Sequence, residues 1–323
     1  MRILVTGGAG FIGSNIVESL LKDARVSYVR VLDNLATGSV NNIEEFYSHS
    51  QFEFVEGDIR DYSACLQACD NIDLVSHQAA LGSVPRSIND PLTTNEVNIT
   101  GTLNIFTAAK EKKVKRVVYA ASSSTYGDHP GLPKVEDKIG KPLSPYAITK
   151  YVNELYAEIF AGLYGMEFIG LRYFNVFGKK QNPKGPYAAV IPLFIEAVLN
   201  KQSPTINGNG EHSRDFTHVT NAVDANILSL FTNNKRAVNQ VYNIAYGRQT
   251  SLLQLFDYLK KISTSNLEPL YAPERVGDVK HSLADISKAK NLLGYDPKIS
   301  VEEGLKKTFE GYKERFESLK LKV

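Results

Sequence analysis

Short apolar runs alternate with longer amphipathic stretches through the first half of the chain. The runs are rich in β-branched and aromatic residues and have the length of strands. They cover residues 2–6, 28–32, 52–56, 72–77, 116–121 and 167–172. The stretches between them are long enough for helices. Strands that alternate with helices predict a parallel sheet with helices on both faces.

The pattern loosens after Arg172. Two loops and two helices are expected there, over residues 178–186 and 203–210 and near residues 188–200 and 251–262, respectively. We therefore expect an α/β protein with a Rossmann-type doubly wound parallel sheet over residues 1–172. A smaller C-terminal α/β domain that binds the substrate is expected over residues 173–323, and segments of the two can interleave at the boundary.

One long connection lies in the first half. Residues 127–143 contain three prolines and three glycines, and the segment exceeds the ~12 to 15 residues beyond which an unstructured loop is usually functional. The helix after it has clear start signals, because Ser144 can cap it and Pro145 suits its first position. Tyr146 then falls in the first turn, where the helix dipole favours a phenolate.

Composition and charge exclude several classes of protein. The 323 residues are 43% hydrophobic and 22% charged, and the net charge of +2 is not clustered as binding to nucleic acid or an anionic membrane would require. No apolar run approaches the ~20 residues that span a bilayer, and the N-terminus reads as a short strand and not as a signal region. We expect a cytoplasmic protein without nucleic-acid or membrane partners.

Residues that commonly bind metals do not form a recognisable site. Cys65 and Cys69 are four residues apart, which matches neither a redox pair nor a zinc site, so we expect them to be packing residues. Only His212 and His218, with Asp215 between them, could be interpreted as metal ligands. Polar loop residues around an arginine are the favoured interpretation, and no metal is expected.

A glycine-rich turn follows the first expected strand and opens the first helix. Gly7, Gly10 and Gly13 would let the chain turn sharply, approach a pyrophosphate and pack the helix against the strand. Asp33 ends the second strand, where a carboxylate accepts ribose hydroxyls. A 2′-phosphate beside it would be repelled, and residues 34–38 contain no arginine, so NAD is favoured over NADP.

Three serines and a tyrosine–lysine pair form the candidate reactive group. Ser122, Ser123 and Ser124 end a strongly apolar run. Tyr146 and Lys150 are four residues apart, which on a helix places the ammonium beside the phenol. A cation there favours tyrosinate, so the group could transfer a proton while a dinucleotide takes a hydride. Taken alone, such a spacing would be explained by an ordinary exposed pair on a helix surface. The glycine-rich turn in the same chain makes that explanation hard to sustain.

These motifs resemble the extended short-chain dehydrogenase/reductase family in its sugar-nucleotide-modifying branch. The resemblance covers essentially the whole chain, through the glycine-rich turn, Asp33-Asn34, Gly57-Asp58, the serines with Thr125-Tyr126-Gly127, Tyr146-x-x-x-Lys150 and the segment Leu171-Arg-Tyr-Phe-Asn-Val-Phe-Gly178. In this family the tyrosine is the catalytic acid/base, and the lysine holds the nicotinamide ribose and lowers the pKa of the tyrosine. A serine or threonine hydrogen-bonds the reacting sugar hydroxyl. The resemblance assigns that role to Ser122, with Ser123 as the next candidate.

The resemblance also implies an NAD site at the carboxyl ends of the strands, where ligands bind in such sheets. The expected residues are Gly7, Gly10, Phe11, Ile12, Gly13, Asp33, Asn34, Gly38, Asp58, Ile59, Gln78, Ala79, Ala80, Tyr146, Lys150 and Tyr173.

The second domain is expected to bind a sugar nucleotide. Arg214 and Arg275 match arginines that clamp the diphosphate in similar epimerases, and a guanidinium suits bidentate phosphate binding. Asn175 resembles a diphosphate or sugar ligand, Asp278 would bind the nucleoside ribose, and residues 205–207 resemble the strand that reads uracil. The expected substrate residues are Ser83, Ser122, Ser123, Tyr146, Asn175, Ala189, Val190, Thr205, Asn207, Arg214, Arg275, Asp278 and Ser282.

Three reactions of this family begin with oxidation at C4 of the sugar. A dehydratase carries an Asp-Glu pair after the serine or threonine, where this chain has Ser123 and Ser124. A glucuronate-type decarboxylase carries a nearby glutamate that is also absent here. A 4-epimerase needs no further proton-transfer group. The resemblance therefore favours an isomerase that epimerises a UDP-sugar at C4 and keeps NAD bound.

Ser282 bears on the choice of sugar. In the UDP-glucose 4-epimerases this position lines the hexose pocket, where a tyrosine excludes a 2-acetamido group and a small residue admits it. With residues 83–86 and 119–122, Ser282 favours the UDP-N-acetylglucosamine 4-epimerases of polysaccharide biosynthesis and interconversion of UDP-GlcNAc and UDP-GalNAc. The alternatives are a 4-epimerase for UDP-glucose/UDP-galactose or a UDP-uronic acid, and a non-catalytic NAD-binding regulator, which often lacks the tyrosine or lysine.

The helix that begins at Tyr146 is apolar on more than one face as far as Tyr164. One face can cover the sheet, and another needs a partner. Homodimerisation through this helix and a helix over residues 92–110 is common in similar enzymes, so we expect a homodimer. Burial under the second domain of the same chain is the alternative.

Overall fold

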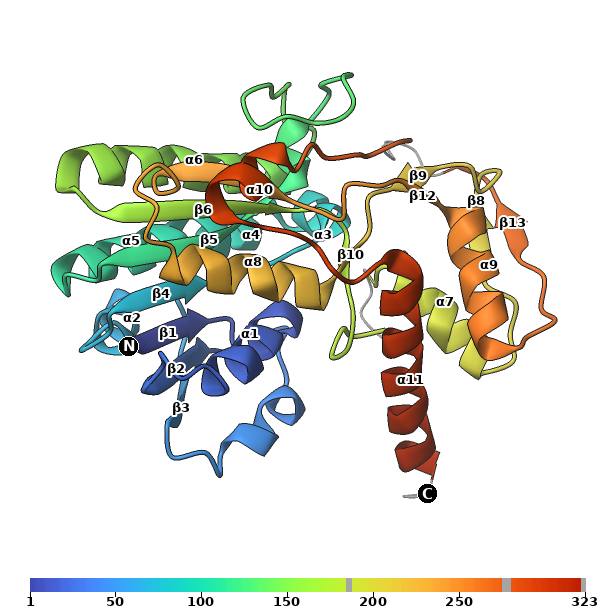
Figure 1. Ribbon diagram of the computed structural model, residues 1–323, viewed down its shortest axis with the longest axis horizontal. Coiled ribbons are helices and arrows are strands. Elements are labelled where there is room, and N and C mark those ends of the chain that lie inside the picture. Colours follow the sequence, from blue (N-terminus) through green and yellow to red (C-terminus); the bar gives the residue numbers. More distant parts are fainter. Residues whose placement is uncertain (184–187, 275–279, 321–323) are drawn as a thin grey trace.

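Seven parallel strands form the central sheet of the protein (Figure 1). The computed structural model describes residues 1–183, 188–274 and 280–320. Across the sheet the strand order is β11-β6-β5-β4-β1-β2-β3. The strands are β1 (Arg2–Thr6), β2 (Tyr28–Asp33), β3 (Phe52–Glu56), β4 (Leu74–His77), β5 (Arg116–Ser122), β6 (Glu167–Tyr173) and β11 (Gln240–Ile244). The expected doubly wound parallel sheet is confirmed.

Six of these strands follow the apolar runs of the first half closely, because a sheet covered on both faces needs strands that are apolar on both sides. The inner strand β1 is an example, with Ile3, Leu4 and Val5 fully buried. Strand β11 is not among the strands predicted from the sequence, since its run of five residues includes the polar Gln240 and Asn243. It is a strand because it pairs in parallel with β6 at the sheet edge.

Helices cover both faces of the sheet. Helices α1 (Phe11–Leu21), α8 (Val219–Phe231) and α10 (Ser287–Leu293) pack on one face around a core that includes Ile16, Val223 and Leu293. Helices α2 (Tyr62–Ala68), α5 (Thr102–Glu111) and α6 (Pro145–Tyr164) pack on the other, around Phe106 and Phe168. Each face thus has its own apolar core.

The helix expected over residues 92–110 has three parts. Helix α4 (Pro91–Asn95) continues through a π-helical stretch (Glu96–Gly101) into α5. Helix α3 (Val84–Asn89) precedes it.

A smaller group of elements lies beside the sheet (Figure 1). Helices α7 (Val190–Leu199), α9 (Leu252–Ser263) and α11 (Val301–Lys320) surround a third core that includes Phe177, Phe194 and Phe256. Two of them match the helices expected near residues 188–200 and 251–262. The short strands pair two by two as β7 (Val176–Phe177) with β10 (Thr217–His218), β9 (Ser213–Arg214) with β12 (Thr250–Ser251), and β8 (Thr205–Asn207) with β13 (Leu270–Ala272).

The chain crosses more than once between the two parts. Strand β11 and helices α8 and α10 come from beyond residue 172, yet they pack with the large sheet. The division at residue 172 stays a prediction, and segments do interleave around it.

Two further features of the described residues bear on function. Cys65 and Cys69 are free and fully buried, and burial raises the pKa of both thiols to about 12. No helix in the described part of the chain is long and apolar enough to cross a bilayer.

Candidate active site

A cavity of about 460 Å³ opens at the carboxyl ends of β1, β2, β4 and β5. All expected cofactor residues except Gly38 line it, from the glycine-rich turn through Asp33, Asp58 and Gln78 to Tyr146, Lys150 and Tyr173. Gly38 instead packs behind the glycine-rich turn, where an added Cβ would lie 2.9 Å from the backbone of Ala9. The cavity is therefore shared by the expected NAD residues and the expected reactive residues.

The glycine-rich turn is built for a close backbone approach. An added Cβ at Gly13 would lie 2.1 Å from the Gly7 carbonyl oxygen. Gly7 has a left-handed φ of 69°, and its Cβ would lie 2.7 Å from the Ala79 nitrogen. No side chain caps helix α1 at Gly10, so the amides of its first turn face the cavity without a side-chain competitor. This turn fits a dinucleotide whose pyrophosphate lies on the helix N-terminus.

Asp33 lies at the end of β2 and is almost fully buried. Its carboxylate accepts hydrogen bonds from the backbone nitrogens of Ala9 at 2.9 Å and Leu35 at 2.8 Å. Burial raises the pKa of Asp33, and these backbone donors oppose the shift. The carboxylate thus fixes the glycine-rich turn against β2 while it lines the cavity.

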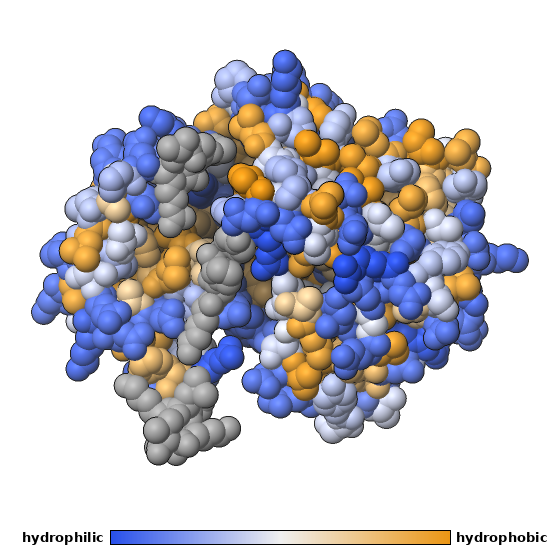
Figure 2. Space-filling view, turned by 180° about the vertical axis from the view of Figure 1, so that it is seen from behind, coloured by the Kyte–Doolittle hydropathy of each residue, from blue (hydrophilic) through white to orange (hydrophobic). Residues whose placement is uncertain are grey.

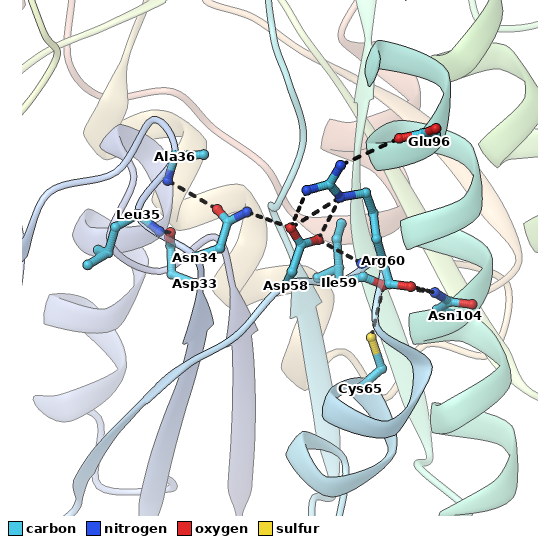
Figure 3. A network of polar contacts seen from close by, with 10 residues as sticks. All are labelled: Asp33, Asn34, Leu35, Ala36, Asp58, Ile59, Arg60, Cys65, Glu96 and Asn104. Carbon is cyan, nitrogen blue, oxygen red and sulfur yellow. Dashed lines mark hydrogen bonds and ion pairs between the residues drawn. The ribbon is translucent and has the colours of Figure 1, made fainter. Parts of the chain in front are cut away.

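A second network lies beside it, at the ends of β2 and β3 (Figure 3). Asp58 accepts from Arg60 at 2.7 Å and from the Asn34 amide at 2.9 Å, and Arg60 lies 3.5 Å from Glu96. The Arg60 guanidinium lowers the pKa of Asp58 to about 2. Arg60 lines the cavity but pairs with two carboxylates, so it is poorly placed to receive a 2′-phosphate. This arrangement agrees with NAD as the cofactor.

Sequence reasoning missed some of the lining residues. Arg60 follows the quoted Gly57-Asp58-Ile59 segment directly, so a search for charged residues just after that motif could have found it. Thr93 and Val97 belong to α4 and the π-helical stretch and lie at the cavity only because these segments fold back over the sheet. No local motif marks them.

The reactive residues come together where β5 meets α6. Ser144 caps α6, its Oγ accepting from the Ala147 nitrogen at 3.1 Å, and Pro145 occupies the first turn, as the start signals predicted. Tyr146 and Lys150 both line the cavity, and the Ser122 hydroxyl acts to lower the pKa of Tyr146. The Ser122 Oγ also accepts from the nitrogen and hydroxyl of Ser124, at 3.1 and 2.9 Å. Ser122 ends β5 and lines the cavity, whereas Ser123 starts the following 3₁₀ turn and does not line it.

The electrostatics of the pair differ from the expectation. Burial raises the pKa of Tyr146 above its ordinary value, and the hydrogen bond with Ser122 opposes that shift. Lys150 donates from Nζ to the Ala120 carbonyl at 2.9 Å, and burial lowers its pKa to about 8. The protein's own groups therefore do not bring the pKa of Tyr146 below its ordinary value, because desolvation of the phenolate outweighs them.

A second cavity, of about 530 Å³, lies between β7 and α7 and shares Asn175 and Val176 with the first. Five more expected substrate residues line it, namely Ala189, Val190, Thr205, Asn207 and Arg214. The Arg214 guanidinium donates to the carbonyls of Ser213 and Lys280 at 3.0 and 3.1 Å. His212, which the sequence analysis treated as an ordinary loop residue, also lines this cavity.

The structure does not bring every expected substrate residue to these cavities. Ser83 caps α3 through a hydrogen bond from the Arg86 nitrogen, and it lines neither cavity, although its neighbours Leu81 and Gly82 line the first. Ser282 also lines neither cavity. Arg275 and Asp278 lie outside the described residues.

A protein-family model described as the NAD dependent epimerase/dehydratase family matches residues 3–245. The chain belongs to this family. A putative UDP-glucose 4-epimerase of Methanocaldococcus jannaschii is 40% identical to it over 308 residues, which cover 94% of this chain and 96% of that protein.

Solved structures with the same fold extend the likeness. A UDP-N-acetylglucosamine 4-epimerase from Methanobrevibacter ruminantium, in complex with UDP-N-acetylmuramic acid, has a TM-score of 0.92 at 40% identity, and the match covers 97% of this chain and 98% of that one. A UDP-glucuronic acid 4-epimerase from Bacillus cereus, in complex with UDP-glucuronic acid and NAD, has a TM-score of 0.89 at 33% identity, with 98% and 100% covered.

Family membership and these likenesses confirm three expectations from the sequence. The chain is an extended short-chain dehydrogenase/reductase of the epimerase type, its cofactor is NAD, and its class of activity is that of the UDP-sugar 4-epimerases, which are isomerases. The names of these relatives give different sugars, so the comparisons do not identify the sugar of this enzyme.

Proposed function

We propose that the enzyme interconverts UDP-GlcNAc and UDP-GalNAc by reversible oxidation at C4. The choice of sugar rests on Ser282, a small residue at the position that gates the hexose in similar epimerases. Ser282 lines neither cavity, but its backbone nitrogen donates to the Ser213 carbonyl at 3.1 Å, next to Arg214. A serine there leaves room for a 2-acetamido group. The UDP-N-acetylglucosamine 4-epimerase at 40% identity supports the same choice.

The reactive residues account for the proton transfers. Tyr146 is proposed to take the proton of the C4 hydroxyl, while Ser122 hydrogen-bonds the same oxygen and orients the Tyr146 hydroxyl. The glycine-rich turn and Asp33 would hold NAD, which would supply the acceptor and donor of the C4 hydride and a positive ring whose charge would lower the pKa of Tyr146. The 4-keto sugar then presents its other face, and Tyr146 returns the proton. Lys150 is proposed to hold the nicotinamide ribose.

The second cavity is proposed to hold the UDP group. Arg214 would bind the diphosphate, and Asn175, which lines both cavities, would sit where the diphosphate joins the sugar. Thr205 and Asn207 would bind uracil. Arg275 and Asp278 keep the diphosphate and ribose roles proposed for them, and Ser83 and Ser123 remain candidates for the sugar.

Other UDP-sugars are the second candidate. The M. jannaschii relative is a putative UDP-glucose 4-epimerase, and the B. cereus structure is of a UDP-glucuronic acid 4-epimerase. UDP-glucose/UDP-galactose or a UDP-uronic acid would use the same reactive residues.

A single incubation tests the proposal. The purified enzyme, without added NAD, is mixed with UDP-GlcNAc, UDP-Glc or UDP-GlcA, and the products are resolved by NMR. We expect UDP-GlcNAc to give UDP-GalNAc with the highest kcat/KM of the three. Turnover of UDP-Glc or UDP-GlcA alone would contradict the proposed sugar, and a stoichiometric requirement for NAD with accumulating keto sugar would contradict epimerisation.

The role of Ser282 is tested by substitution. Ser282→Tyr should lower kcat/KM for UDP-GlcNAc by roughly 10- to 200-fold, the range for steric discrimination by a pocket, and retain turnover of UDP-Glc. Ser282→Ala is the matched control and should keep both activities. Unchanged UDP-GlcNAc turnover in Ser282→Tyr would show that this position does not gate the sugar.

A homodimer is part of the same proposal. Apolar residues gather on the side of the molecule that carries α6, the upper right of Figure 2. Helices α3 and α4 contact α6, and the exposed large hydrophobic residues of these three helices are Val84, Ile88, Leu92, Ile148, Leu155, Ile159, Leu163 and Tyr164. Such a contiguous apolar face favours a partner. We also propose that the protein is cytoplasmic, because both of its cysteines are free and buried.

A further inference from the structure

One buried amide joins three segments that are far apart in the sequence. Asn243 lies on β11 and is completely buried. Its Oδ1 accepts from the Tyr126 hydroxyl at 2.6 Å, and its Nδ2 donates to the carbonyls of Lys134 and Asp285, both at 2.9 Å. These four residues thus meet at a single side chain.

Each of the three segments bears on the proposed site. Tyr126 ends the 3₁₀ turn that follows Ser122. Lys134 lies in the loop 127–143, which connects that turn to Ser144 at the start of α6. Asp285 follows Ser282 by three residues. Asn243 therefore links the proton-transfer residues to the segment that carries Ser282.

Residues 281–285, which we name the strap, have hydrogen bonds along both edges. On one edge the Lys134 nitrogen donates to the Leu283 carbonyl at 2.8 Å, and the Asp285 nitrogen donates to the Lys134 carbonyl at 2.9 Å. On the other edge the strap is bonded to Ser213 and to the buried carboxylate of Asp215, which accepts from the Ala284 nitrogen at 3.2 Å. In Figure 1 the loop 127–143 lies at the top of the view, with the segment that leads into α10 beside its base.

The loop itself is fixed from two sides. The Glu136 carboxylate accepts from the Asn243 backbone nitrogen at 2.9 Å, and the Glu136 carbonyl accepts from the Arg172 guanidinium at 2.9 Å. Arg172 pairs with Glu154 of α6 at 2.7 Å, and both side chains are buried. The loop and the strap therefore form one hydrogen-bonded layer between α6 and the strand that carries Arg214.

Only a neutral amide satisfies this position. The two backbone carbonyls can only accept, so the side chain must present two donors to them, and its oxygen must accept from Tyr126. An aspartate would place its carboxylate, which can only accept, against two carbonyl oxygens that can also only accept. A leucine of similar volume would leave the Asp285 carbonyl and the Tyr126 hydroxyl without the partners described here, at a cost of about 1–3 kcal/mol for each such group. It would also remove one of the two hydrogen bonds to the Lys134 carbonyl, which keeps the bond from the Asp285 nitrogen.

We propose that Asn243 is a positioning residue that fixes Ser282 relative to Ser122 and so sets the sugar selectivity of the epimerase. Asn243 lines neither cavity, so it acts through the strap and the loop. The inference rests on the proposed role of Ser282, and it applies to whichever UDP-sugars the enzyme accepts.

The test compares sugar selectivity in Asn243→Leu with that in a matched control. Asn221 is equally buried and makes two hydrogen bonds with the Ile299 backbone, at 2.8 and 3.0 Å, so Asn221→Ala removes comparable bonds away from the strap. We expect Asn243→Leu to change the ratio of kcat/KM for UDP-GlcNAc over UDP-Glc at least fivefold, mainly through KM. Asn221→Ala should lower the melting temperature but keep the ratio within twofold of wild type.

A milder variant covers the case in which Asn243→Leu does not fold. Tyr126→Phe removes only the hydroxyl that donates to Asn243, and it should shift the ratio in the same direction by a smaller factor. A folded Asn243→Leu or Tyr126→Phe enzyme with the wild-type ratio would overturn the inference. Failure of the proposed sugar is distinguishable, because the wild type would then not turn over UDP-GlcNAc, and the ratio is measured with UDP-Glc and UDP-GlcA instead.

Discussion

At the scale of single residues, the contact between Ser122 and Tyr146 is the feature closest to the chemistry. Burial of Tyr146 raises its pKa because it disfavours the charged phenolate. The Ser122 hydroxyl opposes that rise. The neighbouring Ser123 begins the next turn and does not line the cavity. The two serines, adjacent in sequence, are therefore a natural pair of variants.

Ser122→Ala is expected to lower kcat by roughly 10- to 100-fold, the range for loss of one hydrogen bond to a group that becomes charged. Removing a bond that lowers the pKa of Tyr146 raises that pKa, so the rise of activity with pH should move to higher pH. The measurement is the pH profile of kcat with UDP-GlcNAc or UDP-Glc. Ser123→Ala is the comparison, because Ser123 is the next candidate for this role. We expect a smaller loss and a smaller shift in Ser123→Ala, and effects equal to or larger than those in Ser122→Ala would contradict the assignment.

At the scale of elements, β1, β4 and α5 are joined by a buried histidine. His77, the last residue of β4, lies with Nδ1 2.7 Å from the Thr6 hydroxyl and Nε2 2.9 Å from the Thr102 hydroxyl. Thr102 donates its own proton to the Asn98 carbonyl, so Nε2 carries the hydrogen of a neutral ring. Burial, and next the charge of Lys150, lower the pKa of His77 to about 3.

This histidine predicts acid sensitivity. An unfolded chain binds a proton at His77 below pH 6.5, whereas the native state does not until about pH 3, so the free energy of unfolding falls as the pH drops through that window. At pH 5.5 the loss from this residue is about 1.4 kcal/mol. Urea denaturation at pH 7.5 and 5.5 measures it.

His77→Gln is the variant that isolates the effect. It should be less stable at pH 7.5 but lose less stability between pH 7.5 and 5.5 than the wild type does. His218, whose burial lowers its pKa to about 4, contributes equally to both proteins and cancels. The same loss in both proteins would mean that His77 is protonated in the native state.

At the scale of the whole molecule, the exposed apolar face of α6 stands apart from the site. Ile159 and Leu163 are 56% and 70% exposed, although they are large and apolar. The opposite face of the helix packs on the sheet, with Ala157 and Phe160 buried. Within the described residues, the second part of the chain does not cover this face. We therefore favour a second copy of the chain, in the proposed homodimer, as the partner that covers it.

The double variant Leu155→Glu/Ile159→Glu should convert a dimer into a monomer, because charges placed in an apolar interface must be desolvated. Sedimentation equilibrium measures the mass. Leu270→Glu is the control, since Leu270 is 59% exposed on β13, away from α6, and should leave the mass unchanged. A monomeric wild type would contradict the proposed dimer.

Features that depend on local order could be predicted from the sequence. Apolar runs of strand length located six of the seven strands, and Ser144 and Pro145 located the start of the helix that carries Tyr146. The glycine-rich turn could be predicted because its close backbone contacts join residues only a few positions apart. Asp33 could be predicted because it ends the next strand. Such signals lie within one turn or strand, where backbone geometry fixes which residues are neighbours.

Features that depend on contacts between distant segments could not be predicted, and only the folded chain shows them. The tertiary structure added β11 to the sheet edge, joined two cavities through Asn175, and brought Tyr126, Lys134 and Asp285 to the Asn243 amide. It also shows that the protein's own groups leave the pKa of Tyr146 raised, because desolvation depends on everything packed around the phenol and not only on the lysine one turn away. Burial and long-range hydrogen bonds are set by packing, and spacing along the chain does not encode them.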